Sequence, residues 1–238
     1  MYEYQGLEDI YFVMHYVAAA CFALVACVYL LLRRGNAFAP DVRSSTVLRR
    51  WTAAFMLSIA ASHVWWYVLG IYWLTDDRLV RNITVILLDD ITLVPLAMAV
   101  MLAILQDRKR PLWPWLLSLL PVVVASVVGI TRRSEFLGYE VSHFCQLAVI
   151  VVFVVYYINA LRQYGRWLLD NYADLERKEV WQSVVFVIAL FIVYEVYSTN
   201  AGELLREYLA QFITIIIIAF LLWRVETLQE LESDENEG

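Results

Sequence analysis

The sequence has few lysines, histidines and cysteines, and each shortage excludes a class of function. Its only lysines, Lys109 and Lys178, lie in charged segments between apolar runs. A retinal pigment needs a lysine inside the membrane for its Schiff base, so a retinal cofactor is excluded. The cysteines Cys21, Cys27 and Cys145 lie within apolar runs. We interpret them as small apolar side chains rather than as a disulfide set or a metal site.

The beginning of the chain also lacks a feature of exported proteins. Residues 1–12 contain Glu3, Glu8 and Asp9 but no lysine or arginine. A cleavable signal peptide begins with a basic region, so we expect none here. Phosphate-binding loops, nucleophile elbows and basic nucleic-acid patches are missing as well. We therefore expect neither an enzyme nor direct binding of nucleic acid by this chain.

Long apolar runs dominate what is present. Of the 238 residues, 62% are hydrophobic and 15% aromatic, with a mean hydropathy of +0.63. These values predict an all-α, polytopic membrane protein. The spanning segments predicted from the runs are 10–32, 51–74, 80–105, 112–131, 139–161, 180–199 and 204–224. We expect residues 1–231 to form a single seven-helix transmembrane domain, followed by an acidic disordered tail at 232–238.

The distribution of arginine and lysine predicts the orientation of this domain. With the N-terminus outside and the C-terminus inside, thirteen basic residues are cytoplasmic and five are external. This is the bias of the positive-inside rule, and it favours a multi-pass protein with its N-terminus outside.

Two adjacent acids lie inside the third apolar run. Asp89 and Asp90 would each cost roughly 2.5–3.5 kcal/mol on insertion scales if they faced lipid. Neighbours in a helix point about 100° apart, so we expect one to line a pocket and the other to bond a neighbouring helix. Pro95 frees the carbonyl of Ile91 one turn away, which loosens the helix there.

Most other intramembrane polar groups fall in the same outer half of the predicted bundle, whereas the inner half reads as plain hydrocarbon. We therefore predict a polar pocket that opens to the outside and holds a ligand or ion. The candidate binding residues are His15, His63, Asp89, Asp90, His143, Glu195, Glu207 and Gln211. The alternative for each residue is a simple packing contact between helices.

The cofactor remains open. A metal is one candidate, since Met14 and His15 are ligands for a soft metal and two histidines could hold haem. An intramembrane zinc hydrolase ranks lower. It needs three ligands that converge on one point, whereas His15, His63 and His143 lie at different depths, and residues 201–224 contain no histidine.

Two segments on the predicted cytoplasmic side are candidates for passing a signal to a partner. The segment 162–180 has apolar residues at helical spacing among charges, which is typical of a surface helix or a docking site. The last run continues into an apolar stripe, so we predict one unbroken helix through residues 221–231. The predicted output residues are Trp223, Arg224, Leu228 and Leu231.

Several stretches are similar to a known group of proteins. "LRRWTAAF", "LQDRKRPLWP", "DNYADLERKEVWQS" and "GELLREYLAQFITIIIIAFLLWRVETLQ" resemble the N-terminal membrane region of bacterial transcription regulators. In that group, a seven-helix region precedes a cytoplasmic AraC-type helix-turn-helix domain, for which this chain has no counterpart before Gly238. The resemblance implies a sensor region in the bacterial inner membrane whose output domain is missing here or is a separate protein.

Together, these observations predict a membrane sensor or receptor that takes a periplasmic ligand and signals through the seventh helix and the cytoplasmic loops. The alternative is a small transporter or channel, which would need a polar path through the inner half. The expected partners are the lipid bilayer, an unknown periplasmic ligand, a cytoplasmic output domain or protein, and a second copy of the chain.

Overall fold

The computed structural model describes residues 10–33, 35–37, 44–68, 77–172 and 203–231, with only the backbone given for 203–207. These ranges contain helices, turns and short loops but no strand. The all-α prediction is therefore confirmed for the described part of the chain. The expected tail at 232–238 and the predicted span at 180–199 lie outside the described residues.

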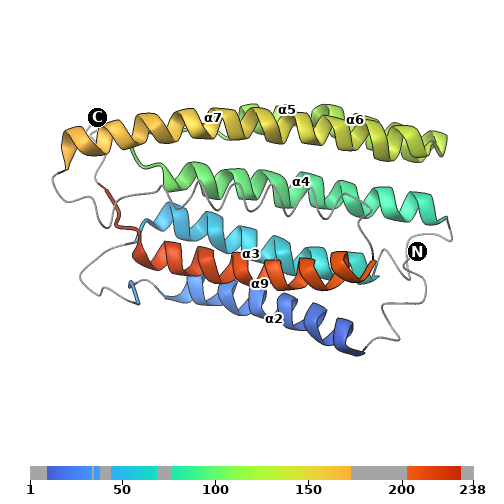
Figure 1. Cartoon of the computed structure of the whole chain (residues 1–238), viewed down its shortest axis with the longest axis horizontal. Helices are drawn as coiled ribbons and strands as arrows, with labels where there is room; N and C mark the ends of the chain where they lie inside the picture. Colours follow the sequence, from blue (N-terminus) through green and yellow to red (C-terminus); the bar gives the residue numbers. More distant parts are fainter. Residues whose placement is uncertain (1–9, 34, 38–43, 69–76, 173–202, 232–238) are drawn as a thin grey trace.

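The helices lie side by side along one long axis (Figure 1). In chain order, they are α2 (Ile10–Leu32), α3 (Thr46–Tyr67), α4 (Arg78–Ile104), α5 (Trp113–Ser118), α6 (Leu120–Arg132), the π-helical turn η2 (Phe136–Val141), α7 (Ser142–Asn171) and α9 (Glu203–Thr227).

The helices pack largely in chain order. α3 packs against α2 and α4, and α4 packs against α5, α6 and α7. α9 returns to the beginning of the chain and packs against α2 and α3. The bundle thus has two ends, which we name after a residue near each. The His63 end holds the start of α2 and the end of α3, on the right in Figure 1, and the Arg49 end holds the start of α3, on the left.

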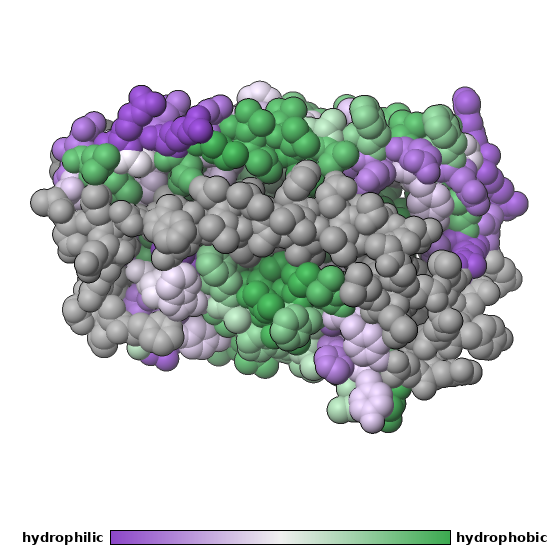
Figure 2. Space-filling model, viewed as in Figure 1, coloured by the Kyte–Doolittle hydropathy of each residue, from purple (hydrophilic) through white to green (hydrophobic). Residues whose placement is uncertain are grey.

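Five helices in the described part of the chain are long and apolar enough to cross a membrane. They are α2, α4, the α5–α6 pair (Trp113–Arg132), the η2–α7 pair (Phe136–Asn171) and residues Tyr208–Thr227 of α9. On the face shown in Figure 2, hydrophobic residues cover the middle of the long axis and hydrophilic ones lie mostly toward its two ends. This is the pattern of a multi-pass membrane protein.

α3 falls outside this set for a physical reason. It carries Arg49, Arg50, Ser62 and His63 among its 22 residues, yet at about 1.5 Å per residue it is as long as its neighbours. Its Arg49, Ser62 and His63 are buried against α2, α4 and α9, whereas Leu57 is exposed. A helix face that packs on other helices tolerates polar residues that a lipid-facing one does not.

Several boundaries differ from the sequence prediction, and α3 begins at Thr46, five residues before the predicted start at 51. The fourth apolar run is broken at Leu119, where α5 ends and α6 begins. Pro121 lies in the first turn of α6, the position in a helix that tolerates proline. α7 continues as helix to Asn171, so the first ten residues of the segment 162–180 extend a spanning helix. α9 ends at Thr227, four residues before the predicted end of the connector helix, and that prediction is therefore wrong.

The largest hydrophobic cluster lies toward the Arg49 end. It joins the second half of α2, the first half of α3, the last turns of α4, the middle of α7 and the end of α9. Tyr157, Ile218, Leu221 and Leu228 are among its most deeply buried side chains. This half of the molecule therefore holds the packed core.

Candidate functional site

His63 is the centre of a polar network at the His63 end. Its side chain is buried, and its Nε2 lies 2.8 Å from Oε1 of Gln211 on α9. Its Nδ1 lies 2.7 Å from the carbonyl oxygen of Ile59, one turn earlier in α3. Tyr16 of α2 donates its hydroxyl hydrogen to the carbonyl of His63 at 2.6 Å, and the two rings lie 4.6 Å apart. His63 thus links α2, α3 and α9.

The hydrogen bonds of His63 restrict where its protons lie. The carbonyl of Ile59 only accepts, so Nδ1 carries a hydrogen. A neutral imidazole then leaves Nε2 as an acceptor, and the amide of Gln211 must turn its NH₂ toward the ring. A charged imidazolium would instead donate from Nε2 to the amide oxygen of Gln211. Gain or loss of one proton or of one bound ion at His63 therefore requires the amide of Gln211 to turn.

Asp89 extends the network to α4. The indole N–H groups of Trp65 and Trp66 donate to its two carboxylate oxygens, at 2.9 Å and 2.6 Å. The hydroxyl of Ser62 lies beside the same carboxylate. Charge-assisted hydrogen bonds of this kind hold an acid in a low-dielectric environment without a cationic partner. The prediction that one of the two acids bonds a neighbouring helix is confirmed for Asp89.

Asp90 is buried and points away from this network. It follows Asp89 by about 100° around α4, and no hydrogen bond joins it to His63 or to Gln211. The outer pocket predicted around both acids thus divides into two places. His63, Asp89 and Gln211 are brought together around α3, and Asp90 stands on another face of α4.

Of the remaining predicted binding residues, His15 and His143 do not join His63. His15 is exposed and bonds the carbonyl of Tyr11 in its own helix, with its ring 5.8 Å from Tyr208. His143 lies on α7, which packs on α4, α5, α6 and η2. Glu195 lies outside the described residues, and so does the side chain of Glu207.

The sequence analysis missed the aromatic donors of this network. Tyr16, Trp65 and Trp66 were not among the predicted site residues, although two adjacent indoles stand within one turn of a polar histidine in the sequence. A buried carboxylate needs donors, and Trp carries only a donor. This signal was available, but only the packing of α3 on α4 identifies which donors reach Asp89.

A second polar cluster occupies the Arg49 end. Arg49 of α3 and Glu226 of α9 lie 2.9 Å apart, with 6% and 3% of their side chains exposed. They are within ion-pair distance, but none of the guanidinium nitrogens is aligned for a hydrogen bond within the described ranges. The other carboxylate oxygen of Glu226 accepts the backbone N–H of Ala37 at 2.5 Å. Glu226 therefore ties α9 to both α3 and the segment after α2.

Polar side chains are also buried deeper in the same half. Arg224 of α9 is buried and interacts electrostatically with Tyr157 and Tyr164 of α7. The expectation that the half of the bundle next to Arg49 is plain hydrocarbon is therefore wrong. The two tyrosines stood inside or beside apolar sequence, which does not show the direction in which a side chain faces.

The chain after α9 folds back onto the bundle. Gln106 donates to the carbonyl of Gln229 at 2.9 Å and accepts the N–H of Leu231 at 2.8 Å. Leu228 and Leu231 are buried, whereas Trp223 is exposed. Two of the predicted output residues are thus packed against the loop that follows α4 rather than presented to a partner.

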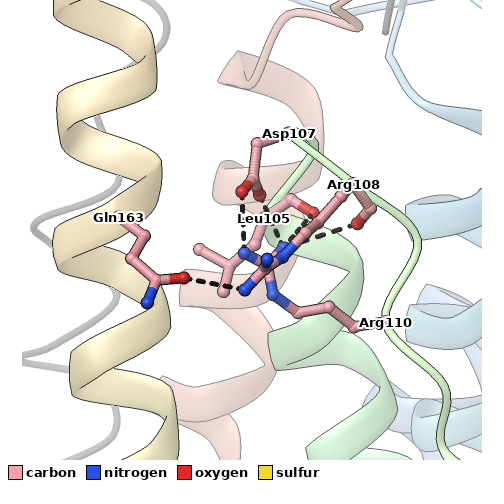
Figure 3. A network of polar contacts seen from close by, with 5 residues as sticks. All are labelled: Leu105, Asp107, Arg108, Arg110 and Gln163. Carbon is pink, nitrogen blue, oxygen red and sulfur yellow. Dashed lines mark hydrogen bonds and ion pairs between the residues drawn. The ribbon is translucent and has the colours of Figure 1, made fainter. Parts of the chain in front are cut away.

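This loop is itself braced by a compact polar network (Figure 3). Arg110 makes a two-pronged contact with the carboxylate of Asp107, at 2.5 Å and 2.8 Å. Arg108 donates to the amide oxygen of Gln163 on α7 at 2.7 Å. The loop therefore connects α4, α7 and the end of the described chain.

In the described ranges, no group of three or more histidine, cysteine, aspartate or glutamate side chains is arranged to hold a metal ion. Comparison with protein-family models, curated proteins and solved structures found no match for this chain. Any functional assignment therefore depends on the geometry of the two polar clusters.

Proposed function

We propose that this protein is a sensory module of the bacterial inner membrane, with seven crossings, its N-terminus outside and its C-terminus in the cytoplasm. α3 supplies a sixth crossing, and residues 180–199 the seventh. In this orientation, the His63 end faces the periplasm. A periplasmic ligand or ion acts on the network of His63, Asp89 and Gln211, and the protein is not an enzyme.

The observation that carries this proposal is the course of α9. Gln211 contacts His63 near one end, and Glu226 contacts Arg49 near the other. Fifteen residues separate them, about 22 Å of helix, without a proline or glycine. A ligand that turns the amide of Gln211 therefore acts on a rigid element, and small helix shifts are an established way to carry a signal across a bundle.

The output follows from the same helix. A shift of α9 changes the pairing of Arg49 with Glu226 and the packing of Leu228 and Leu231 on the loop after α4. The sequence resemblance to the membrane region of AraC-type regulators supports transcription regulation as the response. The surface rearranged at the Arg49 end would then contact a cytoplasmic output domain or protein.

A transporter is the second candidate, and one observation favours it. Tyr157, Tyr164 and Arg224 place buried polar groups in the half of the bundle that was expected to be hydrocarbon. A polar path through that half is what a transporter needs. If transport is the function, Tyr157→Phe and Tyr164→Phe reduce proton flux into proteoliposomes, measured with a trapped pH-sensitive dye. If the protein is a sensor, neither the unchanged protein nor the two variants show proton flux.

The orientation is tested by labelling of single cysteines in intact cells, after Cys21, Cys27 and Cys145 are replaced by alanine. Glu135 and Lys109 are exposed, at the His63 end and the Arg49 end respectively. A membrane-impermeant maleimide should label Glu135→Cys and spare Lys109→Cys. Labelling of Lys109→Cys alone would reverse the orientation.

The coupling is tested with a reporter at the far end. Glu230 is exposed beside the buried Leu231, so a cysteine at 230 reports how tightly this segment packs. In purified protein, His63→Ala should change the labelling rate of Glu230→Cys at least threefold. His143→Ala removes the same side chain outside the network and should leave the rate unchanged. Equal rates in all three proteins would show that the two ends are independent.

A further inference from the structure

Gln146 and Asp90 are buried polar side chains that belong to neither cluster. Gln146 has no exposed surface and Asp90 is 6% exposed. Among the described residues, neither the oxygen nor the nitrogen of the Gln146 amide has a hydrogen-bond partner. Within the described ranges, no side chain forms a hydrogen bond or ion pair with the carboxyl of Asp90. Buried polar groups in native proteins are nearly always paired, so two unpaired ones indicate something that they bind.

The contact between α4 and η2 fixes the level of Asp90. Ile83 packs directly on Gly138, since a Cβ atom on Gly138 would lie 2.2 Å from Cδ1 of Ile83. Asp90 follows Ile83 by seven residues, which is about 10 Å along the axis and about 20° from the same face. The face of α4 that meets η2 therefore carries Asp90 two turns further toward the Arg49 end.

Gln146 stands at the corresponding level of the neighbouring helix. α7 runs in the same direction as α4 (Figure 1), and Gln146 follows Gly138 by eight residues, about 12 Å. In a regular α-helix, eight residues would place Gln146 about 80° around the helix axis from Gly138. The π turn of η2 has more residues per turn, so each residue rotates less and this angle becomes smaller. Gln146 also belongs to the buried stripe of α7 that begins at Ser142. Helical geometry thus places Gln146 and Asp90 on facing surfaces at one level.

A third helix adds oxygen atoms nearby. Ser126 of α6 and Ser142 lie in hydrogen-bond contact, with their hydroxyl oxygens 2.9 Å apart. Ser142 stands one turn before Gln146, on the same stripe. The junction of α4, α6 and α7 therefore gathers a carboxylate, an amide oxygen and two hydroxyls, all of them hard oxygen donors suited to hard cations.

The charge of the junction selects the class of cation. Asp90 is the only carboxylate among these four side chains, and α6 contributes the apolar Val122 near the same level. A monovalent cation neutralises a single carboxylate, whereas a divalent ion would leave a net charge in an apolar interior. We propose that Asp90 and Gln146, beside the Ser126–Ser142 pair, form a binding site for a monovalent cation such as sodium. This site is independent of the sensory role proposed for His63.

The test uses the purified full chain in detergent. Its melting temperature is measured in sodium chloride and in choline chloride at equal ionic strength. An ion that binds only the folded protein raises its melting temperature by mass action. We therefore expect the melting temperature to rise with sodium concentration and to level off about 3–6 °C higher. Equal melting temperatures in the two salts would overturn the proposal.

Matched variants locate the effect. Asp90→Asn and Gln146→Leu should each abolish the sodium-dependent rise. Asp107→Asn and Gln163→Leu make the same substitutions in the loop network of the Arg49 end, and both should retain it. An undiminished sodium response in Gln146→Leu would overturn the site, and this variant decides alone if Asp90→Asn does not fold. A rise on acidification without any rise from sodium would assign a proton to Asp90 and reject the cation.

Discussion

The two ends of the bundle stabilise buried polar groups by different means. At the Arg49 end, Arg49 meets Glu226, and Asp107 meets Arg110, next to the main hydrophobic cluster. At the His63 end, Asp89 is held by indole N–H groups, and His63 by an amide and a backbone carbonyl. Opposite charges inside a packed core resist change, because separating them leaves an uncompensated charge. Hydrogen bonds between uncharged groups cost less to break, so the His63 end is the easier of the two to rearrange.

The comparison predicts that the largest loss of stability follows removal of one charge at the Arg49 end. Glu226→Leu leaves the guanidinium of Arg49 buried and unpaired, so the free energy of unfolding should fall by about 3–5 kcal/mol. Reversible unfolding in mixed micelles measures it. The double variant Arg49→Leu with Glu226→Leu should recover most of the loss. A double variant that costs the sum of the two single losses would contradict a direct pair.

An intermediate loss is expected for Asp89. Asp89→Leu removes both acceptors and leaves the indole N–H groups of Trp65 and Trp66 without a partner. The cost should be about 2–3 kcal/mol by the same measurement, because each buried donor left unpaired costs about 1–3 kcal/mol and the apolar leucine offsets part of this. Asp89→Asn keeps one acceptor and should cost less. An equal cost for the two variants would mean that the indoles do not depend on the carboxylate.

A smaller loss is expected for the link between α3 and α9. Gln211→Leu removes one neutral hydrogen bond to His63, which is worth about 1 kcal/mol. The same variant should increase the labelling rate of Glu230→Cys, because α9 loses its anchor at the His63 end. If stability falls while the labelling rate stays constant, Gln211 has a packing role only. The His63 end would then not differ from the Arg49 end in its ability to rearrange.

The smallest effect is expected at the surface of the Arg49 end. Gln163→Leu removes the exposed hydrogen bond to Arg108, and exposed polar contacts contribute less than about 1 kcal/mol. The unfolding free energy should therefore change by less than about 0.5 kcal/mol. A larger loss would show that the network in Figure 3 holds the loop after α4 and the segment 228–231 as one unit.

The helices were predictable because their signals are local. The apolar run from Ile10 predicted α2 to its last residue. The end of α9 was not predictable from the same kind of signal. Leu228 and Leu231 continue the apolar stripe in the sequence, but they leave the helix because Gln106 satisfies the backbone at Gln229 and Leu231.

The candidate site was predictable only in part. Two adjacent acids within an apolar run had to point apart, and the sequence therefore indicated that one bonds a neighbour. It could not assign Asp89 to Trp65 and Trp66, or Asp90 to the level of Gln146. Those assignments depend on which helices adjoin α4 and on the π turn of η2, neither of which has a marker in the sequence.

By itself, the sequence determined that this chain is helical and embedded in a membrane. Apolar runs of spanning length bury their backbone polar groups only as helices, whatever their neighbours. Tertiary structure alone decided which polar side chains meet, because partners such as His63 and Gln211 are 148 residues apart in the chain. Their contact arises from α9 returning to α2 and α3, and helix packing selects that arrangement by fitting complementary surfaces rather than by any local pattern.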